Sequence, residues 1–156
     1  MMQNNQVALI TGANRGIGLQ IANDLAAHGY TVLVGSRNLE NGETAAKSIG
    51  VQAHALQLDV TDQASIAAAE RVLREFGRLD VLVNNAAIGH TGKPGTPLEE
   101  ILESSRASVA SLDEVRTVFE TNVFGVIAVT QALLPLLRET PAGRIVNATY
   151  RVASVR

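Results

Sequence analysis

The residues Thr-Gly-Ala-Asn-Arg-Gly-Ile-Gly at positions 11–18 decide the fold of this chain. They follow an apolar run, Val7–Ile10, and open a pattern of apolar residues at helical spacing that continues to Leu25. Glycines between a buried strand and a helix let the backbone turn tightly and approach a ligand closely. The start of a helix also offers free N–H groups and a partial positive charge. The stretch therefore predicts a turn that holds an anionic phosphate.

Length and composition limit the kind of protein. The chain has 156 residues, enough for one domain, and 46% of them are apolar, which predicts a packed interior. A net charge of −2 gives no electrostatic case for nucleic acid or an acidic membrane. Without cysteine there are no disulfides or thiolate metal sites, and we expect no metal centre. The first residues lack the features of a signal peptide, and no apolar run approaches the ~20 residues of a membrane span. We therefore expect a soluble cytoplasmic protein.

Apolar strand-like runs alternate with helical patterns along the chain. Strands are predicted near 6–11, 30–36, 52–59, 79–84 and 144–148, and helices near 16–28, 39–49, 62–76 and 112–138. Because the strands are almost continuously apolar, the alternation predicts an α/β fold with a doubly wound parallel sheet. No linker divides the chain, so residues 1–156 are expected to form a single domain. The longest irregular stretch is 86–111, with a short helix predicted at 98–105, and loops of this length are often functional.

The spacing of the three glycines at 12, 16 and 18 is distinctive. It is three residues and then one, whereas the usual dinucleotide fingerprint has one and then two. No Gly-Lys-Ser/Thr follows, so the turn is not a P-loop. A glycine-rich turn alone is weak evidence, but the strand before it and the helix after it favour a nucleotide site over an ordinary turn.

The end of the second predicted strand indicates which nucleotide binds. An acidic residue there would bind the free 2′-hydroxyl of NAD, whereas an arginine suits the 2′-phosphate of NADP. This strand ends in Ser36-Arg37, with no acidic residue before Glu40. Arg37 can form a bidentate pair with phosphate, Ser36 can add a hydroxyl, and Arg15 adds positive charge from the glycine turn. These residues favour NADP over NAD, the alternative being two solvated surface arginines.

Further motifs follow in order along the chain: Asp59-Val60 after the third predicted strand, Asn84-Asn85-Ala86-Ala87 after the fourth, Thr121-Asn122-Val123-Phe124-Gly125 in the long helix, and Gly143–Asn147 in the fifth strand. Together with residues 11–18, this set resembles the short-chain dehydrogenase/reductase family over roughly residues 6–147. The long loop before Asn122 is similar to that of the carbonyl-reductase-like members. The family binds NAD or NADP on a Rossmann-type sheet and transfers a hydride between the nicotinamide and a carbonyl or alcohol carbon. The resemblance implies the strand order 3-2-1-4-5, an NADP(H) cofactor, a small carbonyl or alcohol substrate, and a homo-oligomer.

The resemblance also implies a role for each matching residue. Asp59 and Val60 would hold the adenine, and Asn84 and Ala86 would line the nicotinamide side of the cleft. Asn122 would be catalytic, ordering a water in a proton relay. The pyrophosphate turn would be formed by Gly12, Asn14, Arg15, Gly16, Ile17 and Gly18. Ala87 stands where the family usually has glycine, so an extra methyl group lies there.

The residues taken by themselves leave alternatives open. Asp59 could cap the loop before the next helix, although Asp62 is the better N-cap candidate. Asn84 and Asn85 could be turn residues. Asn122 lies among apolar residues at helical spacing, and a buried asparagine that satisfies a backbone group would fit there equally well.

The end of the chain departs from the family. The family uses a tyrosine as proton donor and acceptor, a lysine four residues later that lowers the pKa of the tyrosine, and a serine after the fifth strand. The sequence contains no Tyr-x-x-x-Lys, and its lysines are Lys47 and Lys93. Tyr150 occupies the position of the serine. We therefore expect a domain that is incomplete at its C-terminus, with the last strands and helices of the family missing.

Two classes of function remain. The leading interpretation is the NADP-binding portion of a reductase that is inactive alone because the tyrosine and lysine are missing. The alternative is a non-catalytic NADP-binding or protein-interaction module. A third, weaker possibility is that no cofactor binds without the lysine. Because the fifth strand would form an open edge, we also expect the chain to associate with itself.

Overall fold

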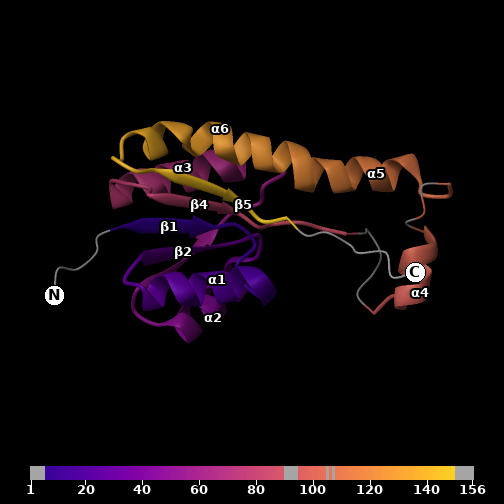
Figure 1. Cartoon of the computed structure of the whole chain (residues 1–156), viewed down its shortest axis with the longest axis horizontal. Helices are drawn as coiled ribbons and strands as arrows, with labels where there is room; N and C mark the ends of the chain where they lie inside the picture. Colours follow the sequence, from indigo (N-terminus) through magenta and orange to yellow (C-terminus); the bar gives the residue numbers. More distant parts are fainter. Residues whose placement is uncertain (1–5, 90–94, 105, 107, 150–156) are drawn as a thin grey trace.

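The computed structural model describes residues 6–89, 95–104, 106 and 108–149. Within these residues, five parallel strands form one sheet in the order β3-β2-β1-β4-β5 (Figure 1). The strands are β1 (Val7–Ile10), β2 (Thr31–Ser36), β3 (Ala53–Gln57), β4 (Val81–Asn84) and β5 (Arg144–Asn147). The structure confirms the predicted α/β class and strand order, which is that of a Rossmann-type fold.

Helices cover both faces of the sheet (Figure 1). Helices α1 (Gly16–Ala27) and α2 (Leu39–Ile49) lie on one face, and α3 (Gln63–Phe76) and α6 (Gly125–Arg138) lie on the other. The short helix α4 (Leu98–Ser104) stands away from both layers and buries none of its residues. The doubly wound arrangement follows from parallel strands joined by helical crossovers.

Alternate residues of β1, β2 and β4 pack into two separate cores, one on each face of the sheet. In β1, Leu9 packs with Leu82, Leu133 and other residues on the α3 and α6 face. Ala8 and Ile10 pack into the core on the α1 and α2 face. Because both faces are covered, β1 and β4 are buried along their whole length, which explains their continuous apolar sequences.

The predicted helix 112–138 is not uniform. It consists of α5 (Leu112–Phe119), a π-helical turn η1 (Glu120–Phe124) and α6. The π-helical turn ends where α6 begins to pack on the segment after β3. There, a Cβ on Gly125 would lie only 2.8 Å from Cγ2 of Val60. Turns of this kind add a residue to the helix and often occur at functional sites. The sequence periodicity did not reveal this turn.

The same stretch carries an apolar surface. By length and composition alone, Leu112–Arg138 could cross a membrane: an 18-residue window within it has a mean hydropathy of 1.4, and 17% of that window is buried. Such a helix is weak evidence for a span, because core helices of soluble proteins share these properties. Here Val129, Leu133 and Leu136 of α6 are buried against the sheet. The opposite side exposes Leu112, Val115, Phe119, Val123, Phe124 and Ile127.

Candidate functional site

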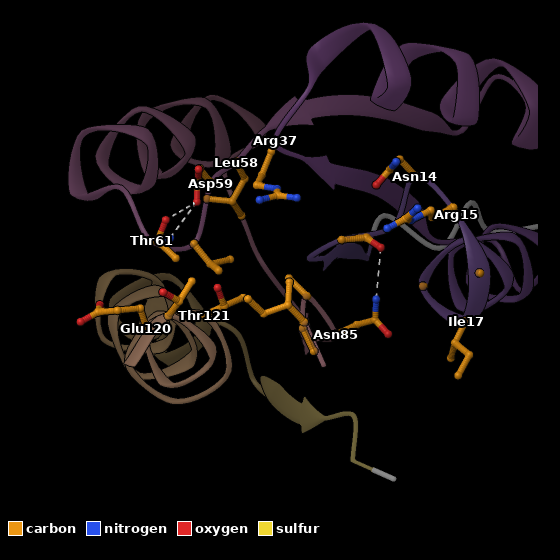
Figure 2. Close-up of a pocket in the computed structure, with 18 of the residues that line it drawn as sticks. Asn14, Arg15, Ile17, Arg37, Leu58, Asp59, Thr61, Asn85, Glu120 and Thr121 are labelled. Carbon is orange, nitrogen blue, oxygen red and sulfur yellow. Dashed lines mark hydrogen bonds between the residues drawn. The ribbon is translucent and has the colours of Figure 1, made fainter. Parts of the chain in front are cut away.

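A cleft of about 690 Å³ opens at the carboxyl edge of the sheet (Figure 2). Its walls come from the segments that follow β1, β2, β3 and β4, and from α5 and η1. In open α/β sheets, ligands bind outside the carboxyl ends of the strands, at the point where the strand order reverses. That point lies between β1 and β4 in this sheet. The cleft is therefore where this fold places a ligand.

The glycine turn forms one end of the cleft. Gly12 and Gly16 have φ values of 63° and 58°, in the left-handed region that favours glycine. A Cβ on Gly12 would lie 2.9 Å from the Cα of Ala86, and one on Gly18 would overlap the side-chain amide of Asn85. At Gly16 no such atom lies within 4 Å. Gly12 and Gly18 are thus required by packing, whereas Gly16 borders open space.

Helix α1 begins in this cleft without a side-chain cap. Arg15 holds the N-cap position and makes no capping hydrogen bond. By contrast, the side chains of Asn38, Asp62 and Ser111 cap α2, α3 and α5. Because Gly16, Ile17 and Gly18 line the cleft, the first N–H groups of α1 are available there to an anion.

Side-chain hydrogen bonds fix the turn to the end of β4. The hydroxyl oxygen of Thr11 accepts from the backbone N–H groups of Asn85 and Ala86, both at 2.9 Å. Nδ2 of Asn85 donates to the carbonyl oxygens of Thr11 at 3.0 Å and Gly12 at 3.2 Å. The two sides of the cleft are therefore held together by the protein itself before any ligand binds.

Two arginines line the cleft at the places that the sequence predicted. Arg15 and Arg37 are both exposed, and neither makes an ion pair with the residues that the structure describes. Ser36 differs, because it is buried and its hydroxyl donates to the carbonyl oxygen of Asn38 at 2.8 Å. The structure does not bring Ser36 to the wall of the cleft.

Asp59 and Val60 line the cleft after β3. Oδ1 of Asp59 accepts from the backbone N–H of Thr61 at 2.9 Å and from its hydroxyl at 2.7 Å (Figure 2). Asp62, not Asp59, caps α3 by accepting from the backbone N–H of Ala64. Asp59 therefore shapes its own loop through one oxygen, and Oδ2 makes no hydrogen bond with the described residues.

Asn84 is buried behind the cleft and does not line it. Its Nδ2 donates to the hydroxyl oxygen of Thr130 at 3.1 Å and to Oδ1 of Asn147 at 2.9 Å. These bonds join β4 to α6 and β5. Ala86, two residues later, lines the cleft as predicted, and Ala87 lines it with a backbone outside the left-handed region.

Asn122 lies in the π-helical turn and binds the backbone across from it. Its Oδ1 accepts from the N–H of Ile88 at 2.9 Å, and its Nδ2 donates to the carbonyl oxygen of Ile88 at 2.7 Å. Both ends of the amide thus bond to one residue of the loop after β4, as the alternative of a backbone-satisfying asparagine predicts, although Asn122 is only half-buried. A part in a proton relay remains a prediction. Tyr150 falls outside the described residues.

Sequence reasoning missed one wall of the cleft. This wall is formed by α5 and η1, through Arg116, Thr117, Glu120 and Thr121. These residues form two pairs four positions apart, which places them on one face of the helix. That spacing was visible in the sequence, but polar residues on a helix usually indicate a solvated face, so the signal was not specific.

Comparison with known proteins identifies relatives of similar sequence. The family model described as "short chain dehydrogenase" matches residues 6–155. Short-chain dehydrogenase anuI of Penicillium roqueforti is 39% identical over 157 residues, covering 96% of this chain and 57% of that protein. Carbonyl reductase [NADPH] 1 of Mus musculus is 35% identical over 158 residues, covering 98% and 52%. The chain thus spans about half the length of these relatives.

Solved structures give the same result. Menthone neomenthol reductase of Mentha piperita superposes with a TM-score of 0.78 at 33% identity, covering 92% of this chain and 60% of that one. A metagenomic short-chain oxidoreductase in complex with NADP has a TM-score of 0.74 at 31% identity, covering 92% and 61%. The 3-ketoacyl-(acyl-carrier-protein) reductase of Brucella melitensis, complexed with NADH, has a TM-score of 0.72 at 35% identity, covering 86% and 50%. With its strand order, its glycine turn and this match over nearly all of its sequence, the chain belongs to the short-chain dehydrogenase/reductase family.

Proposed function

We propose that the cleft binds NADP(H) in preference to NAD(H). The observation that carries this proposal is the combination, in one cleft, of an uncapped helix N-terminus and two arginines that form no ion pair with the described residues. Family membership and solved relatives bound to NADH or NADP support a nicotinamide nucleotide as the ligand. Arginine at the end of β2, with no acidic residue there, supports the 2′-phosphate form.

The residues of the cleft fit the parts of this cofactor. The N–H groups at the start of α1, around Gly16, would bind the pyrophosphate. Arg37, assisted by Arg15, would pair with the 2′-phosphate. The unused Oδ2 of Asp59 would accept a hydrogen bond from the adenine amino group. Ala86 would line the nicotinamide side, with Asn84 supporting it from behind through its bonds to β5 and α6.

For the whole protein we propose the family reaction, hydride transfer from NADPH to a carbonyl carbon or from an alcohol carbon to NADP⁺. When bound, the cofactor would supply or accept the hydride, and the residues of the cleft would bind and orient the cofactor. The 156 residues contain no Tyr-x-x-x-Lys, so we propose that this chain alone binds the cofactor without turnover. That absence also favours the second candidate, a non-catalytic NADP-binding or protein-interaction module. We also propose a cytoplasmic location and residues 1–156 as a single cofactor-binding domain.

Titration of the purified chain with NADPH and NADH tests the nucleotide preference. Arg37→Gln should weaken NADPH binding by roughly 10- to 100-fold, because a hydrogen bond to a charged group contributes about 1.5–3 kcal/mol. NADH binding should change little. Arg138→Gln, at an exposed arginine near the end of α6, is the control and should leave both affinities unchanged. Equal affinity of the unmodified chain for the two nucleotides would contradict the preference for NADP.

NADPH oxidation with a panel of small aldehydes and ketones tests the lack of turnover. We expect binding without carbonyl-dependent oxidation. Turnover that is abolished by Asn122→Ala would instead show that the chain is an enzyme. If neither nucleotide bound, the proposed cofactor site would be excluded and only a protein-interaction module would remain.

A further inference from the structure

A third arginine, Arg116, lines the cleft from the wall formed by α5 and η1. We propose that its guanidinium covers the adenine ring of the bound nucleotide, stacking on the face of the ring. This inference rests on the proposed function, because it assigns a residue to one part of the same ligand. No motif of the chain marked this residue as functional.

Arg116 lies near the part of the cleft where Asp59 would hold the adenine. It lies four residues before Glu120, so the two side chains share a face of the helix. Glu120 and Thr121 lie across from Asp59 and Thr61 in Figure 2. The start of α6, directly after η1, packs on Val60. Arg116 therefore lies one helical turn before Glu120, on the wall that faces the segment after β3.

The surroundings of Arg116 leave the face of its guanidinium free. Among the described residues its side chain pairs with Asp113, with Nη1 2.9 Å from Oδ1. The two side chains are 72% and 93% exposed, and such pairs hold their partners weakly. The hydrogen bond to Asp113 uses an N–H in the plane of the guanidinium. The pair with Asp113 thus does not occupy the flat faces of the guanidinium, on which an aromatic ring can stack.

The local charge favours a ring over a phosphate at this wall. Asp113, Glu114 and Glu120 lie within four residues of Arg116 on the same helical stretch. These carboxylates repel a phosphate dianion, but they do not repel a neutral adenine. Arg15 and Arg37 line the cleft on other segments, without an ion-pair partner among the described residues, and are better placed for phosphate. The adenine is therefore the part of the nucleotide that suits Arg116.

The test compares the affinities of NADPH, NADH and adenosine for Arg116→Gln, because adenosine shares the adenine with the two cofactors but lacks their pyrophosphate. An exposed cation–π contact predicts a loss of about two- to five-fold. The loss should be the same for all three ligands, because all three contain the adenine. Arg106→Gln is the matched control: Arg106 makes the same kind of exposed pair, with Glu103 at 2.9 Å, but does not line the cleft.

Each outcome decides the inference. An equal loss for the three ligands in Arg116→Gln, with Arg106→Gln unchanged, supports it. A loss confined to NADPH would overturn it and assign Arg116 to the 2′-phosphate. Unchanged affinities would overturn it while leaving the proposed function intact, provided that Arg37→Gln still weakens NADPH binding. If the unmodified chain bound none of the three ligands, the proposed function and this inference would both fail.

Discussion

Gly16 differs from the other glycines of its turn in what surrounds it. Gly12 and Gly18 pack against the segment after β4, but a Cβ on Gly16 would meet nothing within 4 Å. We predict that Gly16→Ala costs about 1–2 kcal/mol of unfolding free energy, because alanine is strained at a φ of 58°. The new methyl group would stand where the phosphate approaches. NADPH affinity should therefore fall about tenfold, which corresponds to the loss of one charge-assisted hydrogen bond.

Gly77→Ala is the control for this prediction. Gly77 ends α3 with a φ of 76°, also has no atom within 4 Å of its Cβ position, and does not line the cleft. Urea denaturation should show similar losses of stability for the two variants. Isothermal titration with NADPH should separate them. If Gly16→Ala and Gly77→Ala bound NADPH with equal affinity, Gly16 would be required only for the backbone conformation of the turn and not for the approach of the phosphate.

At single positions, the sequence predicts a site residue when a motif fixes the backbone. The places of Gly12 and Arg37 follow from the ends of β1 and β2, which the apolar pattern located. The sequence does not show the orientation of Ser36, because that orientation depends on the loop that follows, where its hydroxyl donates to the carbonyl oxygen of Asn38. Arg116 was missed because only the folded chain shows that one polar face of α5 borders the cleft.

Among the elements, the long helical stretch shows what periodicity can predict. Its limits, 112–138, were correct, but η1 was not foreseen. A π-helical turn inserts one residue, and a pattern that is apolar on several sides cannot register so small a shift. The turn is accompanied by a contact between segments far apart in the sequence, because Asn122 forms hydrogen bonds with both backbone groups of Ile88.

We predict that Asn122→Ala lowers the unfolding free energy by about 1–3 kcal/mol, since it leaves the N–H and carbonyl of Ile88 without their partner. Gln131→Ala, at an exposed position of α6, should change stability by less than about 0.5 kcal/mol. Urea denaturation monitored by circular dichroism measures both. If the two variants were equally stable, the pairing of Asn122 with Ile88 would contribute nothing to the fold.

For the whole molecule, a core on each face of the sheet was predictable because β1, β2 and β4 are apolar on both of their faces. The sheet is less complete at β5, where all four residues are exposed. The backbone N–H groups of Arg144 and Ala148 donate to β4, at Asp80 and Asn84. The alternate residue Ile145 therefore turns its backbone groups away from β4. No described segment pairs with that side of β5.

We predict that the chain associates with itself through this edge. Ile145 and Val146 are 40% and 48% exposed, and an unpaired strand with apolar side chains readily pairs with another chain. Val146→Lys should shift the molecular mass measured by light scattering toward that of the monomer. The fold should survive, because the valine is half exposed and the lysine can reach solvent.

Two variants separate this edge from the other apolar surfaces. Val51→Lys introduces the same charge at a residue that is 95% exposed and distant from β5, so it should leave the mass unchanged. Phe124→Lys probes the exposed side of η1, which a helical interface would use. If Phe124→Lys alone produced the monomer, association would run through α5 and α6 rather than β5. If the unsubstituted chain were monomeric at high concentration, neither surface would drive association. The unpaired edge of β5 would then be too short to pair with another chain.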